Sequence, residues 1–199
     1  MKSNINQLIN LKYPLLLASQ SPRRRFLLSL LGLEFDVTSV EINEVKFASL
    51  LPSDIVCELA ERKAIEASKL FDKHIIITAD TLVFLDNEVL TKPTNREDAY
   101  RILKLLSGRT HQVYTGIAIL DPKTKSMLIE FEKTDVTIRN LEDEEIWGYI
   151  NSGSPMDKAG AYGIQDDFGA VFVERIEGDY YNVVGLPLCK LYKMLKKME

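Results

Sequence analysis

The sequence has few of the residue types that many catalytic and structural sites require. Its 199 residues include two histidines, His74 and His111, and two cysteines, Cys57 and Cys189, which lie far apart and without metal-ligand spacing. A disulfide framework, a histidine-rich metal site and a Ser-His-Asp hydrolase therefore have little support. We expect His111, near the start of a predicted strand, to have a structural role, and we expect the chain to be cytoplasmic, in a reducing compartment.

Long apolar runs and an excess of positive charge are also missing. No stretch approaches the roughly 18 apolar residues that span a membrane, and the N-terminus lacks the apolar core of a secretory signal. The 25 Lys and Arg are balanced by 29 Asp and Glu, which gives a net charge of −4. Proteins that bind nucleic-acid backbones usually carry a basic excess, so the composition argues against that class. We expect neither a membrane nor a nucleic-acid partner, and no Walker A, GxGxxG or HExxH motif occurs.

What is present is typical of a folded α/β protein. Apolar residues make up 46% of the chain, which is enough for one sizeable core. Predicted strands and helices alternate throughout, which indicates a mixed sheet covered by helices, and we expect a single domain over residues 1–199. The pattern also predicts a helix that begins with a capping box of Thr94 and Glu97, a strand over 170–176 and a helix over 186–198.

The segment from Ser19 to Arg24 carries the strongest local signal for a binding site. A buried strand leads into a helix with Ser21 at its N-cap and Pro22 in its first turn. Free backbone N–H groups and the helix dipole at such an N-terminus favour an anion. Arg23 and Arg24 lie where the dipole disfavours cations, and a bound phosphate would balance their charge. A plain helix cap with solvated arginines explains the same spacing equally well.

Three further signals lie on predicted helices and strands. Lys63 falls on the apolar stripe of a helix predicted over 55–71, so its ammonium either snorkels to solvent or points into a polar cleft. Asp80 ends an apolar strand, where a carboxylate can hold a divalent metal, activate water or simply form a turn. Thr115 and Gly116 inside a strand indicate that two backbone segments approach closely.

The remaining candidates are weaker when each is considered alone. Glu44 follows a predicted strand and Lys92 precedes Pro93 in an extended segment, and residues of this kind are commonly surface charges. The glycine-rich run over residues 157–165 is able to line a ligand, but it also fits an irregular loop that needs small residues.

Taken together, these segments resemble the Maf family of nucleoside triphosphate pyrophosphatases. The matching segments keep the order and spacing of the family and are residues 17–24, 59–64, 79–81, 92–93, 106–116, 157–165 and 184–187. The resemblance implies a fold like that of the inosine triphosphate pyrophosphatases, with an elongated mixed sheet flanked by helices and a cleft between two lobes. It also implies a reaction that needs a divalent metal cation, Mg²⁺ or Mn²⁺, and converts a nucleoside triphosphate and water into a monophosphate and pyrophosphate.

The resemblance assigns roles to individual residues. The family's catalytic carboxylate falls on Asp80, which is expected to hold the metal together with Glu44. The other polar site residues, expected to bind or clamp the phosphates, are Ser19, Arg24, Lys63 and Lys92.

Three positions point to a pyrimidine substrate. Maf proteins that resemble the dTTP/UTP pyrophosphatases carry Arg, Thr and Gln at positions that here are Arg23, Thr81 and Gln165, whereas the branch that acts on 7-methyl-GTP carries Trp, Gln and Glu. A Gln amide offers a donor and an acceptor, which matches the imide edge of uracil or thymine, while a carboxylate only accepts. We therefore expect Gln165 to read the base, and dTTP and UTP to be substrates.

Three features depart from the family pattern. Phe26 stands where the family usually has Glu, which puts in doubt a salt bridge that would orient the neighbouring arginines. Asn43 replaces a commonly acidic residue, and residues 166–168 make the following loop unlike the usual glycine-rich form.

Other functions remain open at this point. The same fold is compatible with damaged purine triphosphates as substrates. A regulatory protein of septum formation or cell division with a nucleotide-sensing site is a different class, and its metal and carboxylate sites would be dispensable. The sequence does not rank dTTP, UTP and modified pyrimidine triphosphates, and it leaves the oligomeric state open, with a homodimer as one possibility.

Overall fold

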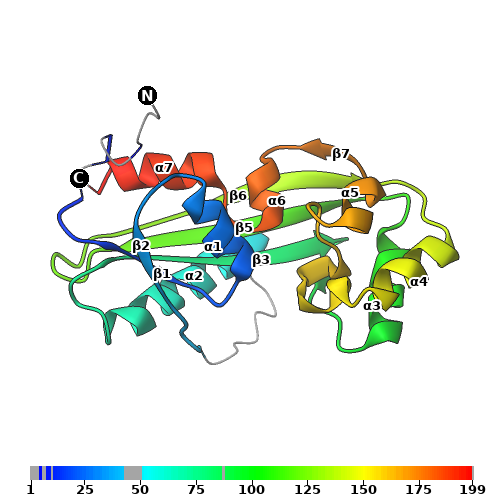
Figure 1. The fold of residues 1–199 in the computed structure, drawn as a ribbon, viewed down its shortest axis with the longest axis horizontal. Coiled ribbons are helices and arrows are strands. Elements are labelled where there is room, and N and C mark those ends of the chain that lie inside the picture. The colour runs from blue at the N-terminus through cyan, green and yellow to red at the C-terminus, as the bar shows by residue number, and fades with distance from the viewer. Residues whose placement is uncertain (1–4, 6–7, 10, 43–50, 87, 199) are drawn as a thin grey trace. The chain divides into compact units, whose positions relative to one another are not determined.

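The computed structural model describes residues 5, 8–9, 11–42, 51–86 and 88–198 (Figure 1). The strands are β1 (Leu15–Ala18), β2 (Phe35–Thr38), β3 (Ile75–Leu85), β4 (Glu88–Leu90), β5 (Thr110–Leu120), β6 (Met127–Ile138) and β7 (Val173–Glu177). The helices are α1 (Pro22–Ser29), α2 (Pro52–Ser68), α3 (Arg96–Leu106), α4 (Asp143–Asn151), α5 (Asp167–Phe172), α6 (Tyr180–Val184) and α7 (Leu188–Lys196), with the short 3₁₀ helices η2 (Ser154–Asp157) and η3 (Ala159–Ala161).

The strands form the mixed sheet that the sequence predicts. Within the described residues the sheet has 7 strands in the order β2-β1-β3-β5-β6-β7, and β4 pairs with β3 off this path. β1 runs parallel to β2 and to β3, whereas the β3–β4 and β6–β7 pairs are antiparallel. In the described part of the chain, no helix is both long and apolar enough to cross a membrane.

The chain divides into two compact units. The first comprises Met1–Asp80, Thr115–Glu132 and Gly185–Glu199, and the second comprises Thr81–Tyr114 and Lys133–Val184. Strands β3, β5 and β6 each run from one unit into the other. The resemblance also implied two lobes, while the single domain and the cleft stay predictions.

In the first unit, the alternation of side chains along the strands decides which residues face α2. Leu16 and Ala18 of β1 and Ile76 of β3 pack in one cluster with alanines of α2, which are Ala60, Ala64 and Ala67. Successive side chains of a strand point to opposite faces, so even-numbered residues of β3 lie on the α2 side. The small alanine side chains let the helix lie close to the sheet.

Gly116 of β5 confirms the predicted close backbone approach. A Cβ built at Gly116 would lie 2.3 Å from the backbone oxygen of Val56 and 2.7 Å from the nitrogen of Cys57, both in α2. Heavy atoms that are not bonded cannot approach so closely, so only glycine fits between the strand and the helix.

The structure corrects the expected position of Asp80. The residue does not end a strand but lies inside β3, which continues for 11 residues from Ile75 to Leu85. The apolar run stops at Asp80 although the strand continues. β1 pairs Leu17 with Ile77 and ends at Ala18, so β3 extends past the carboxyl end of β1. Asp80 therefore lies beyond that end, where sites form in α/β sheets.

The predicted capping box of α3 is wrong by one residue. The N-cap is Asn95, whose side chain accepts a hydrogen bond from the backbone N of Asp98 at 2.8 Å. Thr94 instead donates its backbone N–H and its hydroxyl to the Asp98 carboxylate. Asn is as good an N-cap as Thr or better, and it lies one residue closer to the first apolar position of the helix.

Two predicted elements near the C-terminus also differ from the structure. The expected strand over 170–176 starts only at Val173, because the preceding residues belong to α5. Ala170 N donates to Asp166 O, and Arg139 binds the Val171 backbone oxygen at 2.8 Å, which keeps these apolar residues helical. The expected helix over 186–198 is the shorter α7, and α6, which the sequence did not predict, precedes it.

Candidate active site

The N-terminus of α1 forms as predicted. Ser21 is the N-cap, and its side chain accepts a hydrogen bond from the backbone N of Arg24 at 3.4 Å. The Ser19 hydroxyl accepts from the backbone N of Ser21 at 3.2 Å. No acidic residue lies in the first turn of the helix. The helix dipole and two arginines thus present positive charge at one place, where an anion would be stabilised.

A backbone oxygen holds the Arg24 side chain. Its Nε donates to the carbonyl oxygen of Gly185 at 2.8 Å, in the segment that leads into α7. Burial lowers the pKa of the Arg24 guanidinium, while the charge of Asp80 acts in the opposite direction. Arg23 is partly buried. Phe26, which replaces the family's usual Glu, is 62% exposed.

Lys63 and Asp80 form an ion pair. The Lys63 Nζ contacts Asp80 Oδ1, and the two side chains are 20% and 17% exposed. The pairing follows from the local geometry, because Thr78 of β3 donates its hydroxyl to the Ala60 carbonyl of α2 at 2.6 Å. Asp80 lies two residues further along the same face of β3, and Lys63 lies about one turn further along α2. Lys63 thus points to a carboxylate and does not snorkel to solvent.

The other described candidates belong to the second unit. Thr81 is partly buried in β3, next in sequence to Asp80, and Lys92 is exposed after β4. Gly160 N donates to the Thr91 backbone oxygen at 3.3 Å, which joins the glycine-rich segment to the residue before Lys92. Glu44 and the departure at Asn43 lie outside the described residues, so the pairing of Glu44 with Asp80 stays a prediction.

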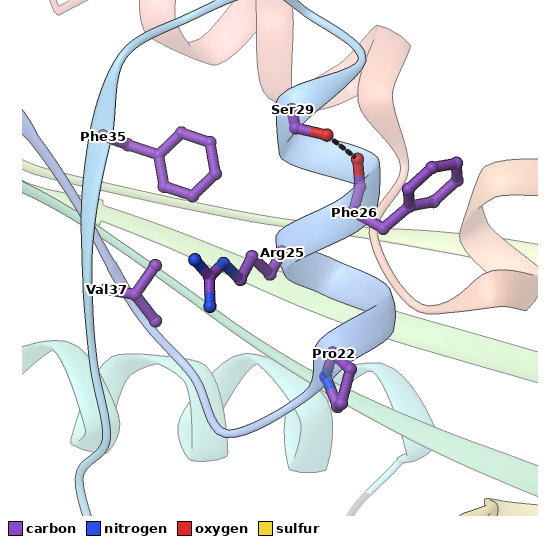
Figure 2. Close-up of a pocket in the computed structure, with 6 residues that line it drawn as sticks. All are labelled: Pro22, Arg25, Phe26, Ser29, Phe35 and Val37. Carbon is purple, nitrogen blue, oxygen red and sulfur yellow. Dashed lines mark hydrogen bonds between the residues drawn. The ribbon is translucent and has the colours of Figure 1, made fainter.

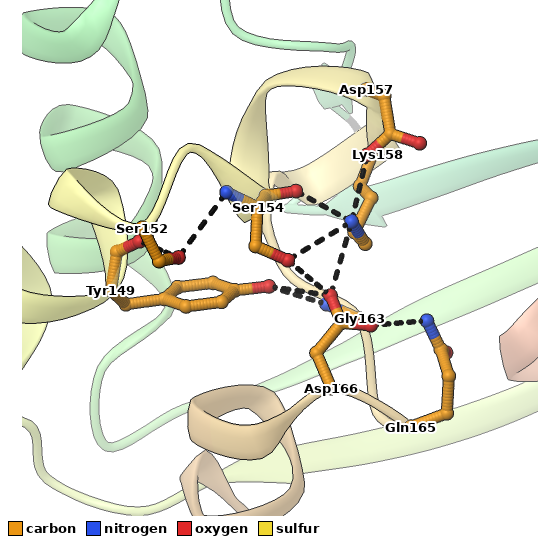
Figure 3. Close-up of polar contacts among 8 residues, drawn as sticks. All are labelled: Tyr149, Ser152, Ser154, Asp157, Lys158, Gly163, Gln165 and Asp166. Carbon is orange, nitrogen blue, oxygen red and sulfur yellow. Dashed lines mark hydrogen bonds and ion pairs between the residues drawn. The ribbon is translucent and has the colours of Figure 1, made fainter.

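Gln165 is exposed, and its Nε2 donates to Asp166 Oδ1 at 2.7 Å (Figure 3). Asp166 in turn is bound by Ser154, Tyr149 and Lys158. The sequence indicated only that residues 166–168 differ from the family pattern. It gave no signal that Asp166 and Lys158 form the centre of a polar cluster, because their partners come from the separate elements α4 and η2.

His111 has the structural role that its place in the sequence suggested. Its Nε2 lies 2.8 Å from the Tyr162 hydroxyl, and the two rings meet edge to face. The imidazole is completely buried, and burial lowers its pKa to about 4. A histidine that is neutral at physiological pH and bonded to a buried tyrosine supports the core of the second unit.

A surface hollow in the first unit does not contain any predicted site residue. It has a volume of about 450 Å³ and is lined by Pro22, Arg25, Phe26, Ser29, Phe35 and Val37 (Figure 2). Four of these residues lie on one face of α1, and the other two, Phe35 and Val37, lie on β2. Arg23 and Arg24 of the same helix are not among them, so the hollow is distinct from the candidate anion site.

Among the described residues, the Asp80 carboxylate is a suitable ligand for a divalent cation. Carboxylate oxygen is a ligand that Mg²⁺ and Mn²⁺ prefer, and Asp80 supplies it next to the α1 N-terminus. Among the residues that the structure describes, no group of three or more Asp, Glu, His and Cys gathers. Mg²⁺ is usually held by one or two carboxylates together with substrate phosphates, so Asp80 fits such a donor set without a larger acidic cluster.

The fold and the site define an α/β protein with a cationic helix N-terminus beside a Lys-Asp pair. The sequence profile of the family described as "Maf-like protein" matches residues 14–198. A dTTP/UTP pyrophosphatase of a Thermoanaerobacter species is 51% identical over 185 residues, which cover 92% of this chain and 95% of that protein. The protein of the same name from Bdellovibrio bacteriovorus is 45% identical over 94% of this chain and 100% of its own length. The chain belongs to the Maf-like family.

Proposed function

We propose that this protein hydrolyses dTTP and UTP to the nucleoside monophosphate and pyrophosphate. The observation that carries the proposal is the Lys63–Asp80 pair, whose carboxylate is close enough to Arg24 of α1 for its charge to raise the pKa of that guanidinium. The names of relatives at 45–51% identity support the substrate class. No described feature favours a regulatory protein, and the acidic net charge of −4 does not favour nucleic acid.

The reaction breaks the anhydride bond between the α- and β-phosphates, and each site residue has a part in it. Asp80 takes a proton from the attacking water. Lys63 pairs with Asp80 and stabilises negative charge on the phosphates. Arg24, which Gly185 holds in place, binds phosphate oxygens with its guanidinium, and the backbone N–H groups after Ser21 add further donors.

The other assigned residues complete the proposal. Lys92 binds phosphate oxygens, and Ser19 lies beside the helix N-terminus. Arg23, Thr81 and Gln165 contact the substrate, and Gln165 reads the imide edge of the base. Asp80 and Glu44 would hold Mg²⁺ or Mn²⁺, which would offset negative charge on the phosphates.

The test is release of pyrophosphate from a panel of canonical and modified nucleoside triphosphates, with Mg²⁺, with Mn²⁺ and with a chelator. We expect metal-dependent cleavage of dTTP and UTP. Asp80→Asn should lower kcat by at least about a hundredfold, since it removes the proton acceptor, in a variant that still folds. Gln165→Glu should weaken the use of both substrates.

The matched control is Asp86→Asn, which makes the same change just past the end of β3. Asp86 pairs with Arg109 on the surface, and this variant should keep the wild-type rate. Near-normal turnover of Asp80→Asn would show that the role given to Asp80 is wrong. No cleavage of any nucleotide with either metal would favour the regulatory class instead.

A further inference from the structure

Asp166 is the centre of a polar cluster in the second unit (Figure 3). Its Oδ2 accepts hydrogen bonds from the Ser154 hydroxyl at 2.7 Å and from the Tyr149 hydroxyl at 3.1 Å, and it lies 3.0 Å from Lys158 Nζ. The side chains of Lys158 and Asp166 are only 9% and 17% exposed. Three donors on one carboxylate oxygen fix the position of the whole carboxyl group.

The Asp166 carboxyl is ionised at neutral pH. Burial by itself raises its pKa, but the hydrogen bonds from Ser154 and Lys158 and the charge of Lys158 outweigh burial and hold the pKa below its usual value. An ionised carboxylate accepts hydrogen bonds and cannot donate them. Its second oxygen, Oδ1, therefore needs a donor, and the amide nitrogen of Gln165 supplies one at 2.7 Å.

Gly163 leaves the space in which the side chains of Lys158, Gln165 and Asp166 approach one another. A Cβ at Gly163 would lie 2.7 Å from Asp166 Oδ2 and from Lys158 Cε, and 2.8 Å from Gln165 Nε2. Gly163 also donates its N–H to the Tyr149 hydroxyl and accepts from the Asp166 backbone N. The three side chains thus gather over a glycine, in space that any other residue would occupy.

We propose that Asp166 is a positioning residue that sets the selectivity for uracil and thymine over cytosine by fixing the orientation of the Gln165 amide. The inference rests on the proposed function. With its nitrogen turned to Asp166, Gln165 presents Oε1 as an acceptor. The N3–H of uracil or thymine is a donor that suits this oxygen, whereas N3 of cytosine is an acceptor and would face it unpaired. A free amide could rotate by half a turn and serve cytosine with its NH₂ group.

The first test is Asp166→Ala, assayed for kcat/KM with UTP and with CTP. The preference for UTP over CTP should fall about tenfold, the equivalent of about 1.4 kcal/mol. Most of the change should come from KM, because Asp166 does not touch the reacting phosphates. Asp166→Asn is the conservative variant, because it keeps an acceptor oxygen. Its preference for UTP over CTP should fall only about threefold.

Asp143→Asn is the matched control, because it makes the same change at an exposed residue of α4 that pairs with Lys104. It should leave the preference unchanged. If Asp166→Ala does not fold, the reduced preference must appear in Asp166→Asn, and an unchanged preference in that variant would overturn the proposal.

A double-mutant cycle separates positioning from general support of the loop. If Asp166 acts through Gln165, Asp166→Ala should change the preference in the wild-type background but not in Gln165→Ala. An equal loss in both backgrounds would mean that Asp166 only supports the loop, and the proposal would be wrong.

The outcomes also distinguish this inference from the proposed function. Cleavage of UTP by the wild type with an unchanged preference in Asp166→Ala overturns the inference alone. If the wild type cleaves no nucleotide, the proposed function fails, and calorimetric binding of UTP and CTP in the presence of a chelator replaces the kinetic readout. Equal binding of the two nucleotides would then overturn the inference as well.

Discussion

At the residue scale, the Lys63–Asp80 pair shows how one contact changes the meaning of a sequence pattern. A lysine on the apolar stripe of a helix usually extends to solvent. Here, however, the face of β3 that packs against α2 carries Asp80. The two side chains are only 20% and 17% exposed, so each charge compensates the other in a largely buried position. The proposed function uses the pair to activate water and to bind the phosphates.

Lys63→Met tests that use. The methionine keeps most of the buried stem and removes the charge, so we expect kcat/KM for UTP to fall about a hundredfold, the usual effect of removing one stabilising group, in a variant that still folds. The control is Lys69→Met, which removes an exposed lysine near the end of α2 and should leave the rate unchanged. A rate for Lys63→Met close to that of Lys69→Met would contradict the role of the pair.

The lowered pKa of the buried His111 predicts how the free energy of unfolding changes at acidic pH. Its pKa is lowered from 6.5 to about 4 in the folded protein, so between these values the unfolded chain binds a proton that the folded protein does not. Stability is therefore fully present above pH 6.5 and is lost as the pH falls towards 4, by about 3 kcal/mol for this residue.

His111→Gln should flatten that part of the stability profile, because a glutamine can still bond Tyr162 but does not titrate. Urea unfolding at a series of pH values measures the effect. An identical pH dependence in the variant and the wild type would show that His111 does not carry it.

At the scale of the elements, the packing of β5 on α2 depends on one missing side chain. Gly116→Ala would place a Cβ 2.3 Å from a backbone oxygen, and a backbone cannot yield as a flexible side chain does. We expect a loss of at least about 2 kcal/mol in the free energy of unfolding, as for other overpacked cores. Chemical denaturation checks this value.

The comparison variant is Gly148→Ala, the same substitution inside α4. Its Cβ would lie 3.4 Å from the Phe168 ring, an ordinary contact, and alanine favours a helix by about 0.5–1 kcal/mol over glycine. This variant should be neutral or stabilising. Equal effects of the two substitutions would mean that the contact between β5 and α2 is looser than the structure shows.

At the scale of the whole molecule, ligand binding should raise the stability of the native chain. With dTTP at about 100 times its dissociation constant, linkage predicts a gain of about 2.7 kcal/mol. Differential scanning calorimetry with a chelator present, which prevents turnover, measures the gain as a rise in melting temperature. ATP at the same concentration is the control and should give a smaller rise, and equal rises would contradict selection of the base.

The sequence by itself determined the class of fold and most of its local elements. The buried strand before Ser19, the Ser21 cap with Pro22 and the glycine at position 116 depend on nearest neighbours and on backbone sterics, so they can be read from the residues alone. The family motifs added the substrate class and the candidate residues, because their order along the chain is itself sequence information.

Only the tertiary structure decided what these residues touch. Asp80 lies inside β3, which extends past the end of β1, and its pairing with Lys63 depends on which face of the sheet α2 covers. Arg24 binds a backbone oxygen 161 positions away in sequence, and Gln165 is oriented by a carboxylate that Tyr149 and Lys158 hold. Such contacts arise from the packing of segments that are far apart in the chain. Hydrophobic periodicity and local propensity describe neighbouring residues only, so they do not predict which distant segments come into contact.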